Sequence, residues 1–93
     1  MPADLYEKTH RYEKLLAAAL EKAVPSPIEA SHMRAVAKDF KTMAESYYKD
    51  GLFFIGQEDY VNALASFSYG HAWLDAGAKL GIFDVDDDVL FTI

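Results

Sequence analysis

The stretch YVNALASFSYGHAWLDAGAKLG, residues 60–81, decides the fold. Apolar or small residues recur in it every three or four positions, the spacing of one face of an α-helix. The recurring positions are Tyr60, Ala63 with Leu64, Phe67, Gly70, Leu74 and Gly77. Between Tyr60 and Ala78 the only formal charge is Asp75. A helix that is apolar around most of its circumference is buried on several sides, so we expect the central helix of a helical domain.

The flanks of this stretch predict a helix over residues 58–80. Glu58 and Asp59 favour the N-terminal end of a helix dipole, while Lys79 suits the last turn and Gly81 the C-terminal cap. Polar residues that lie on every face argue against a lipid-facing helix, and we therefore expect no membrane span. These residues are Asn62, Ser66, Ser68, His71 and Asp75.

Upstream, residues 3–24 show a second stripe with alternating spacings of four and three. Its members are Leu5, Thr9, Tyr12, Leu16, Ala19 and Ala23. The Pro25-Ser26-Pro27 segment ends this helix, because a residue that precedes proline disfavours the α conformation.

The next helix is predicted over residues 27–55. Ser26 is a suitable N-cap, Pro27 suits the first helical position, and Glu29 completes a capping-box spacing. The apolar rhythm then continues through Gly51, as Val36, Phe40, Met43, Tyr47, Gly51 and Phe54. An end at Gly51 is the alternative, but the continuous period favours one long helix with its turn at Gly56-Gln57.

Together these elements predict an all-α, antiparallel up-down-up three-helix bundle that forms a single domain over residues 1–93, with an apolar tail over 82–93. Residues 89–93 are nearly all apolar, so we expect them to fold back on the helices or to enter a partner's groove. Two neighbours cannot cover the whole apolar circumference of helix 58–80. The sequence therefore predicts either a homodimer through this helix or coverage by the tail.

Composition and charge exclude several classes of function. The 93 residues contain no Cys, which excludes disulfides, thiolate metal sites and cysteine nucleophiles. All of the net charge of −6 arises in residues 57–93, so nucleic-acid binding is not expected. Arg34, Lys38 and Lys41 share a helix face, which we interpret as an ordinary solvated face. The N-terminus has no basic and apolar leader pattern, and we expect a cytoplasmic protein.

No catalytic, cofactor or metal motif is found. The acidic run 84–88 lacks the glycine and the distal acid of a calcium loop, which favours a solvated linker. His71 and Asp75 are spaced i,i+4, a spacing that allows an imidazole–carboxylate hydrogen bond on one helix face. The only cluster that resembles a site is Asn62, Tyr69, His71, Trp73 and Asp75. A satisfied interior histidine is the more common interpretation of such a cluster.

The chain also resembles a known family, DUF357, which comprises short archaeal proteins of unknown function. The residues that carry the resemblance are 60–77 (YVNALASFSYGHAWLDAG), 80–83 (LGIF), 48–51 (YKDG) and Phe53-Phe54. The resemblance implies a cytosolic, all-α, three-helix protein of archaeal type. It implies no catalytic residues, because none are assigned in that family.

Our leading hypothesis is therefore a protein-interaction or self-association module and not an enzyme. Its expected contact residues are Tyr60, Leu64, Phe67, Leu74, Leu90 and Phe91. The alternative is a small-ligand or enzymatic pocket built by Tyr69, His71, Trp73 and Asp75, with Asn62 beside it. No cofactor is expected for either.

Overall fold

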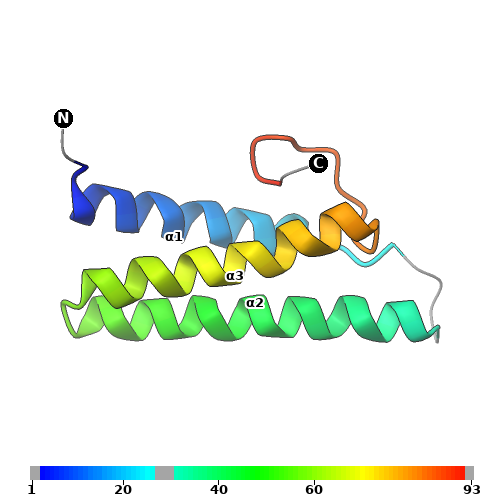
Figure 1. The fold of residues 1–93 in the computed structure, drawn as a ribbon, viewed down its shortest axis with the longest axis horizontal. Helices are drawn as coiled ribbons and strands as arrows, with labels where there is room; N and C mark the ends of the chain where they lie inside the picture. Colours follow the sequence, from blue (N-terminus) through cyan, green and yellow to red (C-terminus); the bar gives the residue numbers. More distant parts are fainter. Residues whose placement is uncertain (1–2, 27–30, 92–93) are drawn as a thin grey trace.

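The computed structural model describes residues 3–26 and 31–91, which form helices α1 (Leu5–Lys22), α2 (His32–Gly56) and α3 (Tyr60–Leu80). The chain runs up, down and up again, and α3 lies between the other two helices (Figure 1). Helix α3 packs against both α1 and α2, whereas α1 and α2 make little contact with each other. The predicted three-helix bundle with a central last helix is confirmed.

Helix α1 follows the predicted stripe. Asp4 caps it by accepting a hydrogen bond from the Glu7 amide, 3.1 Å away, and the stripe residues Thr9, Leu16 and Ala19 are buried. The buried Thr9 hydroxyl donates to the Leu5 carbonyl at 2.7 Å and lies 3.3 Å from the Tyr60 carbonyl of α3. A polar group on this stripe is therefore satisfied at the contact between α1 and α3.

Helix α2 passes through Gly51 without a break, as predicted, but it begins later than predicted. Ser31 is its N-cap and accepts from the Arg34 amide at 3.1 Å. The Ser26 hydroxyl instead donates to the Gly81 carbonyl at 2.6 Å. The prediction that Ser26 caps α2 is therefore wrong, because its side chain makes a tertiary contact with the end of α3. The predicted start at Pro27 and the capping partner Glu29 lie outside the described residues.

The core of α2 consists of small residues seven positions apart, Ala37, Ala44 and Gly51. The larger members of the predicted stripe flank this line and are half-buried, except that Met43 is exposed. At Gly51 the Phe67 ring of α3 approaches so closely that a Cβ would lie 2.3 Å from ring carbon Cε1. The ring thus fills the space that any side chain at this position would need.

Helix α3 begins at Tyr60, two residues later than predicted, because Asp59 is its N-cap and accepts from the Asn62 amide at 3.1 Å. Its C-terminal end is capped as predicted, by Gly81 in the left-handed region with φ 77°. After Gly81 the chain pairs with the segment that follows α1, through the Asp84 amide and the Val24 carbonyl at 2.8 Å. The end of α3 is thereby attached to the end of α1.

Candidate functional site

The C-terminal tail, residues 82–91, returns to the helices (Figure 1). Its side chains Ile82, Phe83, Leu90 and Phe91 are buried, whereas Val89 is 81% exposed. The tail therefore covers part of the apolar surface of the bundle from within the same chain. The sequence predicts that helix 58–80 is covered either by a second copy or by the tail. The structure shows coverage by the tail over part of this helix.

Asp87 holds the tail in place. Its Oδ2 accepts from the Lys22 Nζ of α1 at 3.0 Å, and its Oδ1 accepts from the amides of Val89 and Leu90 at 2.9 and 3.1 Å. The hydrogen bond from Lys22 and those from the two amides all favour the ionised form, so they lower the pKa of the Asp87 carboxyl below its ordinary value. The acidic run thus contains one residue with a defined structural role.

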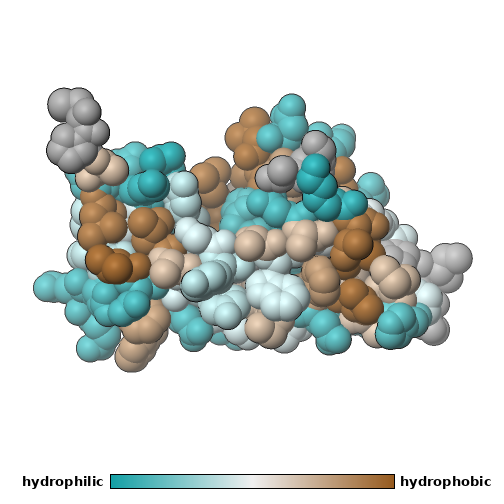
Figure 2. All heavy atoms as spheres, viewed as in Figure 1, coloured by the Kyte–Doolittle hydropathy of each residue, from teal (hydrophilic) through white to brown (hydrophobic). Residues whose placement is uncertain are grey.

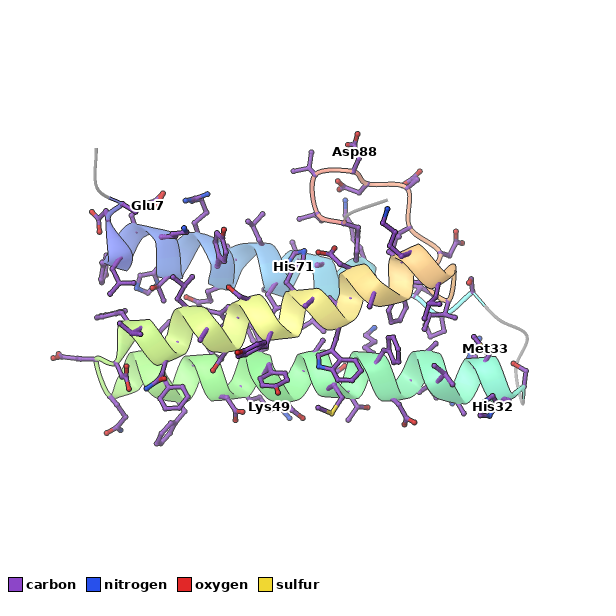
Figure 3. All side chains as sticks on the ribbon, viewed as in Figure 1. Glu7, His32, Met33, Lys49, His71 and Asp88 are labelled. Atoms are coloured by element: carbon purple, nitrogen blue, oxygen red, sulfur yellow. The ribbon has the colours of Figure 1, made fainter. Side chains whose placement is uncertain are left out.

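His71 attaches the tail from the side of α3. Its Nε2 is hydrogen-bonded to the Leu90 carbonyl and lies 3.8 Å from Asp75 Oδ1. A carbonyl only accepts, so Nε2 carries the hydrogen and donates it to Leu90. Figure 3 shows His71 between α1 and α3, below the loop that carries Asp88. His71 and Asp75 thus lie side by side on one helix face, but their 3.8 Å separation is longer than the hydrogen bond that the spacing allows, and His71 contacts the tail instead.

Between α1, α3 and the tail lies a groove of about 610 Å³, open to solvent. The groove has lining residues from all three elements. They are Arg11, Tyr12 and Leu15 of α1, Phe67, Ser68, His71, Ala72 and Asp75 of α3, and residues 88–91 of the tail. The lining mixes one guanidinium, two carboxylates and aromatic carbon. In the described parts of the chain, no group of three or more histidine and acidic side chains is arranged to hold a metal ion.

The structure brings together only two of the five residues of the cluster predicted from sequence. His71 and Asp75 line the groove, whereas Trp73 lies edge-on to Phe40 of α2, with ring centroids 5.0 Å apart. Tyr69 contacts the Tyr47 ring of α2, with ring centroids 5.7 Å apart, but remains 62% exposed. Positions two apart on a helix point in directions about 200° apart, which separates residues 69 and 73 from 71 and 75.

Asn62, the remaining member of that cluster, lies near the start of α3 and donates from Nδ2 to Asp59 Oδ2 at 2.6 Å. The amide therefore supports the cap of α3. It does not line the groove.

The residues expected to contact a partner lie on the inner side of the bundle. Phe67 and Leu74 are fully buried, Leu90 and Phe91 are nearly so, and Tyr60 and Leu64 are half-buried. Their apolar surface is covered by this chain's own helices and tail. In this conformation they are not available as a flat surface for another molecule.

An adjoining side of α3, which we call the α3 solvent face, is exposed and shares Ser68 and Ala72 with the groove. Its nine exposed residues are Val61, Asn62, Ala65, Ser68, Tyr69, Ala72, Ala76, Lys79 and Leu80. Lys79 is the only charged residue among them, whereas α1 and α2 each expose five charged residues. Val61, Tyr69 and Leu80 are 60–65% exposed. Figure 2 shows a pale to brown band across the molecule where α3 runs.

The sequence predicts that two neighbours leave part of this helix uncovered, but the contact residues named from it follow the apolar stripe toward the core and are not on this face. The signal that identifies the face is the absence of charge on the opposite arc, where a solvated helix carries Lys and Glu. Placing the same residues on a helical wheel, at about 100° per residue, gathers all nine within about a third of the circumference.

The fold and the surface define a class of protein: a small all-α bundle whose central helix is covered by its own tail on one side and uncovered and nearly uncharged on another. Among the described residues no helix has the length and apolar character needed to cross a membrane.

A model of the family described as "Protein of unknown function (DUF357)" matches residues 11–83, and the chain belongs to this family. The matched region contains all of α2 and α3 and ends before the acidic run. Comparison with curated proteins and with solved structures gives no match.

Proposed function

We propose that this protein is an association module that binds another protein surface through the α3 solvent face. The observation that carries the proposal is the near absence of charge on a helix face that spans the whole of α3. An outward face with no partner is under no constraint to exclude charged residues, and the outward faces of α1 and α2 contain them freely.

Physical magnitudes support this role. Full burial of a large apolar side chain contributes about 1.5–3 kcal/mol. Val61, Tyr69 and Leu80 each have 60–65% of their surface left to bury, which corresponds to about 1–2 kcal/mol each. The alanines between them allow a second helix to approach closely, and no charge in the middle of the face has to be desolvated.

The small-ligand pocket is the weaker candidate. The groove is present, but the His71 side chain that a ligand would meet there is already engaged. His71 holds the Leu90 carbonyl, and Asp75 lies beside His71. A ligand that used these groups would first have to displace the tail. Trp73 and Tyr69, which the hypothesis also required, contact rings of α2 and do not line the groove.

A photo-crosslinking experiment in the cells that make the protein tests the proposal. A photoreactive amino acid replaces Ala65 on the α3 solvent face or, as the matched control, Ala35 on the charged outer face of α2; both positions are exposed. We expect a protein adduct from position 65 and none from position 35. Mass spectrometry then identifies the crosslinked chain.

The proposal is wrong if position 65 gives no adduct, or if both positions give the same adducts in the same yield. Circular dichroism of both purified variants checks that each keeps its helix content. Because both substituted side chains point into solvent, neither substitution disturbs the core.

A further inference from the structure

The α3 solvent face has a symmetric pattern. Along the helix its apolar residues are Val61, Ala65, Tyr69, Ala72, Ala76 and Leu80, with spacings of four, four, three, four and four. From either end the order is a large aliphatic residue, then alanine, with one tyrosine and one alanine at the centre. A partner of unrelated sequence would impose no such symmetry, whereas a two-fold axis requires the surface to complement itself.

From this symmetry we infer that the occupant is a second copy of this chain, packed antiparallel along α3 about a two-fold axis level with Tyr69 and Ala72. The inference rests on the proposed association through the same face. In this register Val61 lies opposite the partner's Leu80, Ala65 opposite the partner's Ala76, and Tyr69 opposite the partner's Ala72. A large ring thus meets a methyl group at the centre, and small residues meet on either side, where two backbones can approach closely.

The charges favour the antiparallel orientation. Lys79 lies near the C-terminal end of the face, while Asn62 and the capping carboxylate of Asp59 lie at its N-terminal end. An antiparallel pair places each Lys79 opposite the partner's Asn62, one turn from the partner's Asp59. A parallel pair would place Lys79 against Lys79, which is unfavourable.

The acidic run lies beside this face. Asp87 is held by Lys22 of α1, whereas Asp88 lines the groove that Ser68 and Ala72 of the α3 solvent face also line, so one carboxylate of each copy lies near the edge of the proposed contact. Two chains with a net charge of −6 still repel each other at long range. Because salt screens that repulsion within about 10 Å at 0.1 M, we expect added salt to strengthen the dimer.

The size of the surface indicates a weak dimer. Helix α3 has 21 residues, so the face is about 30 Å long at about 1.5 Å per residue. With a width of about 12 Å, two copies bury about 700 Å², below the range of permanent interfaces and within that of transient ones. Measurements therefore have to extend to about 1 mM protein, where a weak dimer is populated.

Disulfide trapping tests both the occupant and its orientation. The chain has no Cys, so single-cysteine variants report one position each. Ala65→Cys and Ala76→Cys are mixed in equal amounts and oxidised mildly. We expect the mixed 65–76 disulfide to form, with little 65–65 or 76–76 product. Ala35→Cys mixed with Ala65→Cys is the control and should give background crosslinking only.

A second pair of variants does not depend on disulfide geometry. Ala65→Glu and Ala76→Lys each bury one unpaired charge at the proposed contact, so each single variant should weaken self-association about tenfold or more. In the double variant the glutamate introduced at position 65 would meet the lysine introduced at position 76 of the other copy. Self-association should then return to within about threefold of the wild type. Positions 65 and 76 are three turns apart in one chain, about 16 Å, so the two introduced charges cannot pair internally.

Homodisulfides at either position, or a dimer whose affinity none of the variants changes, would overturn the antiparallel contact. If the protein stays monomeric at about 1 mM, the inference that a second copy binds the α3 solvent face is wrong. In that last case an adduct from position 65 in cells with a different protein would still support the proposed function, so the two failures are distinguishable.

Discussion

Replacement of Gly51 by alanine tests the packing of α2 against α3, because two effects of opposite sign compete there. In a helix interior, alanine is favoured over glycine by about 1 kcal/mol. The new Cβ would however lie 2.3, 2.6 and 2.7 Å from three ring carbons of Phe67. Phe67 is fully buried and its ring is rigid, so the core has to shift to admit the methyl group.

Such overpacking costs about 1–3 kcal/mol, and three contacts below 3.0 Å place Gly51→Ala in the upper part of that range. The net expectation is a loss of about 1–2 kcal/mol in the free energy of unfolding, or a fall in Tm of about 5–10 °C for a domain of this size. Urea unfolding followed by circular dichroism at one fixed protein concentration measures it.

Gly56→Ala is the matched control, because nothing lies within 4 Å of a Cβ at Gly56. We expect this variant to be neutral or stabilised by about 0.5 kcal/mol. In the double variant Gly51→Ala with Phe67→Leu, the smaller side chain should relieve the clash, so the combined loss is smaller than the sum of the single losses by about 1 kcal/mol. A rise in stability for Gly51→Ala alone would refute this reasoning.

Three further predictions concern the tail. The pKa of Asp87 is lowered in the fold, so its ionised form stabilises tail docking above the ordinary carboxyl pKa of about 3.9. That stabilisation is lost as the pH falls through the lowered pKa that Asp87 has in the folded protein. Amide exchange at Leu90 should report this loss, and the pH effect should be absent in Asp87→Asn. His71→Ala removes the donor to the Leu90 carbonyl and should cost about 0.5–1.5 kcal/mol in urea unfolding, with faster exchange at the Phe91 amide; unchanged exchange would contradict the role of His71. Deletion of residues 84–93 uncovers the floor of the groove and should raise the fluorescence of a hydrophobic dye, whereas an unchanged signal would mean that the tail shields little apolar surface.

The sequence predicts the helical architecture well because each helix carries a local signal. The stripe of α1, the unbroken period of α2 through Gly51 and the cap at Gly81 all depend on residues within one or two turns of each other. The start of α2 could not be predicted in this way. Ser26 has the composition of an N-cap, but its hydroxyl is used by the Gly81 carbonyl, 55 positions later in the chain.

The candidate site shows the same limit. The i,i+4 spacing of His71 and Asp75 is local, and both residues do line one groove. The Leu90 carbonyl that His71 binds belongs to a tail whose path depends on tertiary packing. The α3 solvent face was, in contrast, predictable from spacing alone, because it requires only that uncharged residues be placed on a wheel.

Amide chemical shifts recorded during dilution of the purified protein, from about 1 mM to about 20 µM, test the α3 solvent face most directly. We predict concentration-dependent shifts at Val61, Ala65, Ala72 and Ala76, and constant shifts on the outer faces of α1 and α2. Shifts that do not change with concentration, or changes confined to α1, α2 or the tail, would contradict self-association through this face.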